Sequence, residues 1–134
     1  MKSNILKKYN LEFIFVASPK RLFYYLSNVD GLSEWFADSV KFKDETFHFC
    51  WGETEQQALI VNKKENEFIR FRWLDEDEDV FFEFAVSNES ISNEITLIIT
   101  DFSFENEIKN AEMVWNEAVK KLIRLLGTKL INPN

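Results

Sequence analysis

The sequence predicts an α+β fold, in which a curved antiparallel sheet of about six to seven strands wraps around one long C-terminal helix. Three observations predict it. Apolar residues alternate with period two over much of residues 40–102, an apolar stripe of helical period runs over residues 106–126, and only short turns separate the strand segments. Short turns favour antiparallel pairing, and the last helix is the only element long enough to cover an aromatic sheet face.

The first strand is expected at residues 10–16, followed by a helix over residues 19–26. Ser18 and Pro19 are typical of a helix start, because serine accepts from the first free N–H groups and proline fits the first helical position. One face of the strand and one stripe of the helix are apolar, formed by Leu11, Phe13, Phe15, Leu22, Phe23 and Leu26.

A second short helix is predicted at about residues 30–36, with Asp30 as its cap. Its inward side would carry Leu32, Trp35 and Phe36. The two short helices would then form an elbow between the first strand and the rest of the sheet.

The next three segments show strand periodicity. Val40 and Phe42 share one side, and the segment 54–62 is a more polar strand with Leu59 and Val61 as its clearest apolar side. Between them, the alternating aromatic residues Phe47, Phe49 and Trp51 oppose His48 and Cys50.

Residues 68–73 and 80–87 are predicted to form a hairpin with its loop at residues 74–79. Its register pairs Trp73 with Val80, Phe71 with Phe82, and Ile69 with Phe84. The same register places Arg70 opposite Glu83 on the other face, which is a favourable cross-strand charge pair. One register therefore satisfies both faces.

The last strand is expected at residues 95–102 and the long helix at about residues 106–126, ended by Gly127. Thr96 and Thr100 would point outward. The inward strand residues are Ile95, Leu97, Ile99 and Asp101, and the helix stripe is Ile108, Ala111, Trp115, Ala118, Val119, Leu122 and Leu126.

Length and charge bound the possible functions. The 134 residues suit one domain over 1–134 with a core at about 10–127, and no internal repeat is seen. A net charge of −7 disfavours nucleic-acid binding, and the single cysteine excludes an internal disulfide. Because no apolar run suits a signal peptide or a membrane helix, we expect a cytoplasmic protein without membrane insertion.

Several short motifs resemble the helix-grip fold of the START-like (SRPBCC-type) superfamily, in the branch related to the activator of Hsp90 ATPase. The resemblance extends from about Leu11 to Gly127 and is most similar to small stand-alone bacterial START-like proteins. The motifs are Ala17-Ser18-Pro19, Leu26-Ser27-Asn28, residues 31–38 (GLSEWFAD), residues 47–52 (FHFCWG), Phe71-Arg72-Trp73 and Trp115-Asn116-Glu117-Ala118.

This resemblance implies a cavity between the C-terminal helix and the sheet that takes a lipophilic small molecule. The residues expected to line it are Trp35, Phe36, Phe49, Trp51, Phe71, Trp73, Phe82, Phe84, Asp101 and Trp115. The alternative is that these rings fill the core, as buried aromatic side chains usually do. Trp51, Trp73 and Trp115 could each offer an indole N–H to a ligand.

Polar candidates are few. Asp101 could anchor a polar ligand group or cap the chain that follows it, whereas Arg72 is expected on the solvated outer face. His48 and Cys50 have a metal-ligand spacing, but with one His and one Cys in the chain we expect no metal and no cofactor. The acidic run 75–79 is expected to be a solvated turn.

Three functions follow from these observations. The first is a non-catalytic module that binds a hydrophobic small molecule or lipid between helix and sheet. The second is a co-chaperone-like or homodimeric interaction module whose acidic surface recognises the partner. Met113, Val114 and Ile123, which lie off the main helix stripe, would either widen the buried face or supply part of a homodimer contact. The third is a cyclase or dehydratase-type enzyme, for which Asp101 and the more distant Tyr9, Tyr24 and Tyr25 are the available acids.

Overall fold

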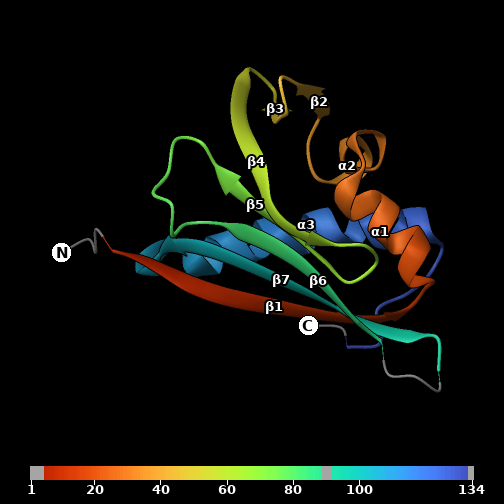
Figure 1. Cartoon of the computed structure of the whole chain (residues 1–134). Coiled ribbons are helices and arrows are strands. Elements are labelled where there is room, and N and C mark those ends of the chain that lie inside the picture. Colours follow the sequence, from red (N-terminus) through yellow and green to blue (C-terminus); the bar gives the residue numbers. More distant parts are fainter. Residues whose placement is uncertain (1–4, 89–91, 133–134) are drawn as a thin grey trace.

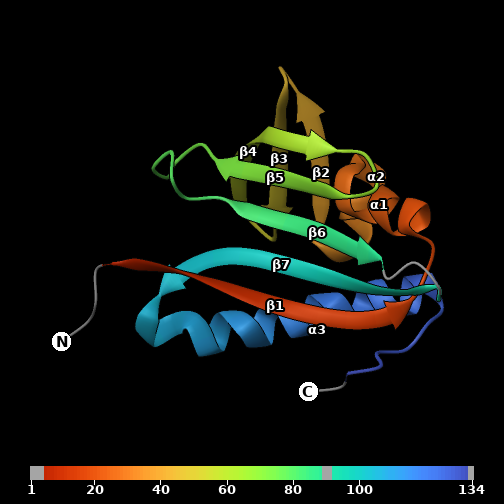
Figure 2. The ribbon, with the colours of Figure 1, turned by 60° about the horizontal axis from the view of Figure 1, so that its bottom comes forward.

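The computed structural model describes residues 5–88 and 92–132, and the strands within them form one seven-stranded antiparallel sheet (Figures 1 and 2). Its order is β1-β7-β6-β5-β4-β3-β2, so the first and last strands of the chain are neighbours. The strands are β1 (Leu6–Val16), β2 (Ser39–Lys43), β3 (Thr46–Trp51), β4 (Thr54–Lys64), β5 (Phe68–Trp73), β6 (Phe82–Asn88) and β7 (Glu94–Phe104).

Two short helices and one long helix accompany the sheet. Helices α1 (Pro19–Ser27) and α2 (Val29–Trp35) follow β1, and the 3-10 turn η1 (Glu105–Glu107) leads from β7 into α3 (Ile108–Leu126). Figure 2 shows β1 and β7 running beside α3, while β2 and β3 stand at a steep angle to them, so that the sheet curves around the helix. The predicted helix-grip architecture is confirmed.

The elbow of α1 and α2 forms for local reasons. The Ser18 hydroxyl accepts from the Arg21 N–H at 3.3 Å, and Pro19 occupies the first helical position as predicted. The cap of α2 is not Asp30 but Asn28, whose side-chain oxygen accepts from the Asp30 N–H at 2.9 Å. The prediction was wrong because asparagine and aspartate cap equally well, and α2 starts one residue earlier than expected.

Gly31 allows the two short helices to pack closely. A Cβ atom at this position would lie 2.4 Å from the Tyr24 carbonyl oxygen and 2.7 Å from the Tyr25 Cα. These are backbone atoms that cannot move aside easily, so the close approach requires glycine. The approach in turn fixes the direction in which α2 presents Trp35 and the following Phe36.

The central hairpin has the predicted register. Phe71 pairs with Phe82, Ile69 with Phe84, and Arg70 with Glu83. The Arg70 Nε donates to Glu83 Oε1 at 2.9 Å, and the guanidinium also lies 3.9 Å from the centre of the Phe81 ring. The expected Trp73–Val80 pair lies outside the ladder, because β6 begins at Phe82 and the loop is correspondingly longer.

One of the predicted inward faces is wrong. In β4 the buried side chain is Ala58, which pairs with Phe47 and Trp73, whereas Leu59 pairs with the outward Arg72 and Val61 is 48% exposed. The sheet register sets this side, and the shift of register between Ile60 and Asn62 interrupts the alternation at Val61.

In β2 the side chain of Phe42 is also largely exposed, although Val40 is buried. This strand is at the edge of the sheet, and its end has no partner beyond β3 within the described residues. Among the aromatic rings of the described residues, the Phe42 ring contacts that of Phe47, at 5.0 Å between centroids. Edge position, which periodicity does not reveal, therefore accounts for the difference.

Helix α3 buries Trp115, Val119, Leu122 and Leu126 of the predicted stripe, and its other members, Ile108, Ala111 and Ala118, are half-buried. It ends at Gly127, which has the left-handed φ of 69° that a helix C-cap of this type requires. The last carbonyls of the helix are bound from α1, because the Arg21 guanidinium donates to Leu126 O at 2.8 Å and to Leu125 O at 2.9 Å.

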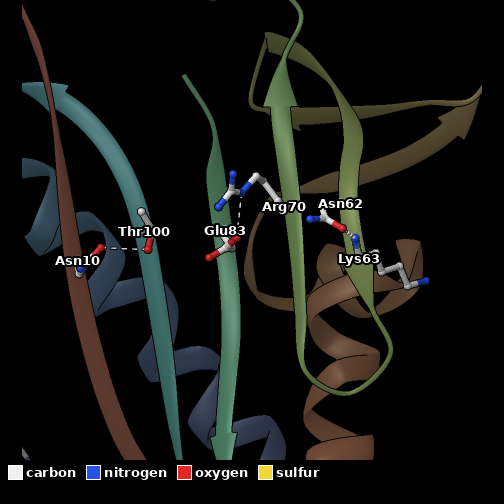
Figure 3. A network of polar contacts seen from close by, with 6 residues as sticks. All are labelled: Asn10, Asn62, Lys63, Arg70, Glu83 and Thr100. Carbon is white, nitrogen blue, oxygen red and sulfur yellow. Dashed lines mark hydrogen bonds and ion pairs between the residues drawn. The ribbon is translucent and has the colours of Figure 1, made fainter. Parts of the chain in front are cut away.

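The outer face of the sheet is polar (Figure 3). Thr100 donates to Asn10 Oδ1 at 3.0 Å across β7 and β1, and the Arg70–Glu83 pair bridges β5 and β6. The inner face is aromatic, with Phe49, Phe71 and Phe84 fully buried. The features from which a ligand site can be built therefore lie on the inner, α3-covered face.

Candidate ligand-binding groove

A cluster of aromatic rings fills much of the space between α2, the sheet and α3. Phe36 is at its centre, with ring centroids 5.0 Å from Phe49, 5.4 Å from Trp51 and 5.6 Å from Trp115. Phe71 and Phe82 stack 4.8 Å apart beneath it on the sheet. Such tilted and offset contacts are favourable for aromatic pairs, so these rings stabilise the fold as well as shape the interior.

Most of the indole N–H groups are used inside the protein. Trp35 donates to Tyr25 O at 2.7 Å and Trp51 donates to Phe36 O at 3.0 Å, and these bonds connect α2 to α1 and the C-terminal end of α2 to β3. Trp115 donates to Asp101 Oδ2 at 3.0 Å. The idea that Trp51 and Trp115 have free N–H groups is therefore wrong, and among the described residues only Trp73 lacks an acceptor for its indole N–H.

Part of the interior stays open. A recess of about 310 Å³, here called the aromatic recess, opens beside α3. Trp51 and Trp73 are only half-buried, so one part of each ring remains available to a ligand. The residues that line the recess are Phe36, Trp51, Trp73, Asp101, Ala111, Val114, Trp115 and Ala118.

A second hollow continues from the recess toward α2. This helix groove has a volume of about 640 Å³ and shares Phe36, Trp51, Val114 and Ala118 with the aromatic recess. Its rim is more polar and carries three carboxylates and one ammonium group, from Glu34, Asp38, Glu117 and Lys121. The two hollows adjoin each other where their shared lining residues lie.

Asp101 is the acidic residue of the aromatic recess. Its Oδ1 accepts from the Phe102 N–H at 2.8 Å, and its Oδ2 accepts from the Tyr9 hydroxyl at 3.2 Å and from the Trp115 indole. Burial raises the pKa of the Asp101 carboxyl, although these three hydrogen bonds oppose the rise. Burial and the neighbouring Asp101 charge also raise the pKa of Tyr9.

The aromatic candidates separate into two groups. Phe36, Trp51, Trp73 and Trp115 line the recess together with Asp101. Trp35 lines the helix groove, and Phe49, Phe71, Phe82 and Phe84 are fully buried beneath these rings without lining either hollow. The alternation of side chains along β3, β5 and β6 predicted correctly which rings face inward. It does not distinguish rings at the open end of the interior from rings in the filled core.

Sequence reasoning missed part of the wall. Ala111, Val114 and Ala118 lie along one side of α3 and leave room for the recess because their side chains are small. The two alanines, seven residues apart on the predicted stripe, were the available signal. Of the other stripe-flanking residues, Ile123 is buried, whereas Met113 is 63% and Val114 62% exposed.

The other polar candidates lie elsewhere. His48 Nδ1 contacts Glu55 Oε1 at 2.8 Å, and no group of three metal-ligating side chains is present in the described part of the chain. Arg72 faces outward beside Leu59, with its Nε buried and without a partner among the described residues. Residues 75–79 are exposed, and no helix within the described ranges is long and apolar enough to cross a bilayer.

The model of a START-like superfamily domain matches residues 3–128, almost the whole chain. The chain belongs to the START-like superfamily. The solved structure of BfR322 from Bacteroides fragilis shares 35% sequence identity with it, the match covers 93% of this chain and 92% of that chain, and the TM-score is 0.62. No curated protein matches the chain significantly.

More distant solved structures share the fold. The Aha1 dimer from Colwellia psychrerythraea is 14% identical, with 91% of this chain and 96% of that chain covered and a TM-score of 0.71. CalU16 from Micromonospora echinospora is also 14% identical, with 93% and 82% covered and a TM-score of 0.71. These similarities show that the fold is shared. Because one fold can host many functions, the function must be inferred from the residues of the groove.

Proposed function

We propose that this START-like protein binds a small hydrophobic molecule in the aromatic recess and the adjoining helix groove. The observation that supports this most is the combination of half-buried Trp51 and Trp73 with the small side chains of Ala111 and Ala118 around one opening. Exposed aromatic surface of this kind is costly in water, and an apolar ligand would remove it from solvent. The lining thus resembles that of ligand pockets, which are mostly apolar with few polar groups.

The proposal is tested by thermal denaturation with octanol, decanol and dodecanol, together with native mass spectrometry of protein purified from cells. At a ligand concentration of about 100 times Kd, linkage adds roughly 2.7 kcal/mol of stability, which should raise Tm by roughly 10 °C. A bound mass in the native spectrum would identify the cellular occupant.

Filling the recess provides the matched control. Ala118→Leu should abolish the ligand-induced rise in Tm, because the larger side chain occupies ligand space between α3 and Trp51. Lys109→Leu adds the same side chain at an exposed position of α3 outside both hollows and should leave the rise intact. No rise in the unmodified protein, or an equal rise in the Ala118→Leu variant, would refute binding at this place.

Self-association is a second candidate, supported by the adjacent exposed side chains of Met113 and Val114 on α3. Exposed neighbouring apolar side chains often mark protein contacts, and the related Colwellia structure is described as a dimer. Sedimentation velocity over a concentration series distinguishes a dimer from a 16.0 kDa monomer. A monomer at all concentrations would exclude this candidate.

A further inference from the structure

Asp101 places a carboxylate at the wall of the aromatic recess without a positively charged partner. Within residues 5–88 and 92–132, no lysine, arginine or histidine forms an ion pair with it. The groups that do contact it are the neutral donors of Tyr9, Trp115 and the Phe102 backbone. A partly buried carboxylate that has lost water but gained no countercharge is unfavourable, so a cation at this position would be stabilised.

The rings that line the recess together with Asp101 favour a cation as well. Trp51 and Trp73 lie 6.3 Å apart at an interplanar angle of 60°, and Phe36 lies 5.4 Å from Trp51. Aromatic faces attract positively charged groups within about 6 Å of the ring centre, and tryptophan does so most strongly. A positively charged nitrogen in the recess would therefore meet both ring surface and the Asp101 carboxylate.

The rim of the helix groove beside the recess is negatively charged, as Asp101 is when ionised. Glu34, Asp38 and Glu117 on the rim of the helix groove outnumber Lys121, and the chain carries a net charge of −7. Such a field raises the local concentration of cations and disfavours anionic amphiphiles such as fatty acids. Rim charges alone would not define a site, but here they line the groove that adjoins the aromatic recess, whose wall carries a carboxylate without an ion pair.

We infer that the ligand of the aromatic recess is an amphiphilic amine, with an apolar body in the groove and a positively charged nitrogen held between Asp101 and the tryptophan rings. This inference rests on the proposed function, because it names the chemical class of the molecule that occupies the same hollow.

Three probes with the same chain separate the inference from the proposed function. Octyltrimethylammonium, octanol and octanoate carry similar eight-carbon chains with a positive, a neutral and a negative head group, and isothermal titration calorimetry measures the affinity of each. We expect the ammonium compound to bind about tenfold more tightly than the alcohol and octanoate to bind most weakly. Equal binding of ammonium and alcohol, or preference for octanoate, would overturn the inference and leave the apolar site standing. Absence of binding by all three would refute both.

Single substitutions test which residues cause the preference for the ammonium compound over the alcohol. Asp101→Asn should bring the ammonium and alcohol affinities to within about threefold of each other, while Asp75→Asn in the exposed loop should leave their ratio unchanged. If Asp101→Asn does not fold, Trp73→Leu replaces it. The Trp73 indole N–H has no acceptor among the described residues, so this substitution breaks no hydrogen bond there. It removes one of the rings beside Trp51 and should also lower the ratio of the ammonium and alcohol affinities. A ratio that stays high in both variants would show that the cation is bound elsewhere.

A pH series adds an independent readout, because the charge of a quaternary ammonium does not change with pH. The ratio of the octyltrimethylammonium affinity to the octanol affinity should fall on acidification, because the Asp101 carboxylate becomes protonated. The groups that face it are Tyr9 from β1 and Trp115 from α3, and Glu112 of α3 lies close to Tyr9. A ratio that is constant across the acidic range would contradict the role of Asp101.

Discussion

Asp101 shows how one residue serves the fold and the site together. The alternation of side chains along β7 directs its carboxylate inward. There it accepts hydrogen bonds from the Phe102 backbone N–H and from the side chains of Tyr9 on β1 and Trp115 on α3. The capping role and the inward role expected from the sequence are thus both present. Because Asp101 joins β1, β7 and α3, its carboxyl is largely removed from water. The loss of water disfavours the charged form and raises the pKa of the carboxyl.

This cost makes stability depend on pH in a defined direction. A carboxyl whose pKa is higher in the folded state than its ordinary value of 3.8 binds its proton more tightly when folded. Its stabilising contribution is therefore present at low pH and is lost as pH rises through the folded pKa. We predict that the free energy of unfolding of the wild type, relative to Asp101→Asn, falls as pH rises from below 3.8 toward neutrality.

Urea denaturation of both proteins at matched pH values measures this difference. The exposed Asp75→Asn variant serves as the control for general charge effects, and its difference from the wild type should vary much less over the same range. A difference that instead grows with pH in the Asp101→Asn comparison would mean that folding lowers the pKa of Asp101.

At the scale of elements, the position of α3 depends on contacts at both of its ends. Trp115 in its N-terminal half binds Asp101 of β7, and the carbonyls of Leu125 and Leu126 at its C-terminal end bind Arg21 of α1. The positive guanidinium also opposes the partial negative charge of a helix C-terminus. These contacts keep α3 over the sheet while the small side chains in between leave the recess open.

Replacement of Arg21 tests the C-terminal contact. Arg21→Ala should lower the free energy of unfolding by about 1–2 kcal/mol, because two carbonyl groups lose a charged donor. Arg21→Lys should recover part of the loss, since it keeps the charge but not the forked geometry. The neighbouring exposed Lys20→Ala should have little effect. Chemical denaturation measures all three, and equal stability of Arg21→Ala and Lys20→Ala would show that the contact contributes nothing.

At the scale of the whole molecule, the sequence predicted the architecture because several signals agreed. In the β5–β6 hairpin, the Phe71–Phe82 pair and the Arg70–Glu83 pair require the same register, and the structure has it. In β4 a single signal misled, since the burial of Ala58 follows from its neighbours and from a register shift at Val61. Periodicity is a reliable guide where both faces of a strand constrain it.

The recess was less predictable because it depends on contacts far apart in the chain. Arg21 reaches carbonyls more than 100 residues away, at Leu125 and Leu126, and the acceptors of the Trp51 and Trp115 indoles lie on other elements. No local pattern carries such information. Whether a ring on the inner face fills the core or borders an opening depends on the size of the residues opposite, here Ala111 and Ala118.

The central claim is that a ligand occupies the aromatic recess, and the indole N–H signals of the four tryptophans report on it directly by two-dimensional NMR. Titration with octyltrimethylammonium should shift the Trp73 signal most, with clear shifts for Trp51 and Trp115. The Trp35 signal should change least, because Trp35 is the one tryptophan that does not line the aromatic recess. Unchanged signals for Trp51, Trp73 and Trp115 at saturating ligand, with shifts confined to amides of the outer sheet face, would contradict the account.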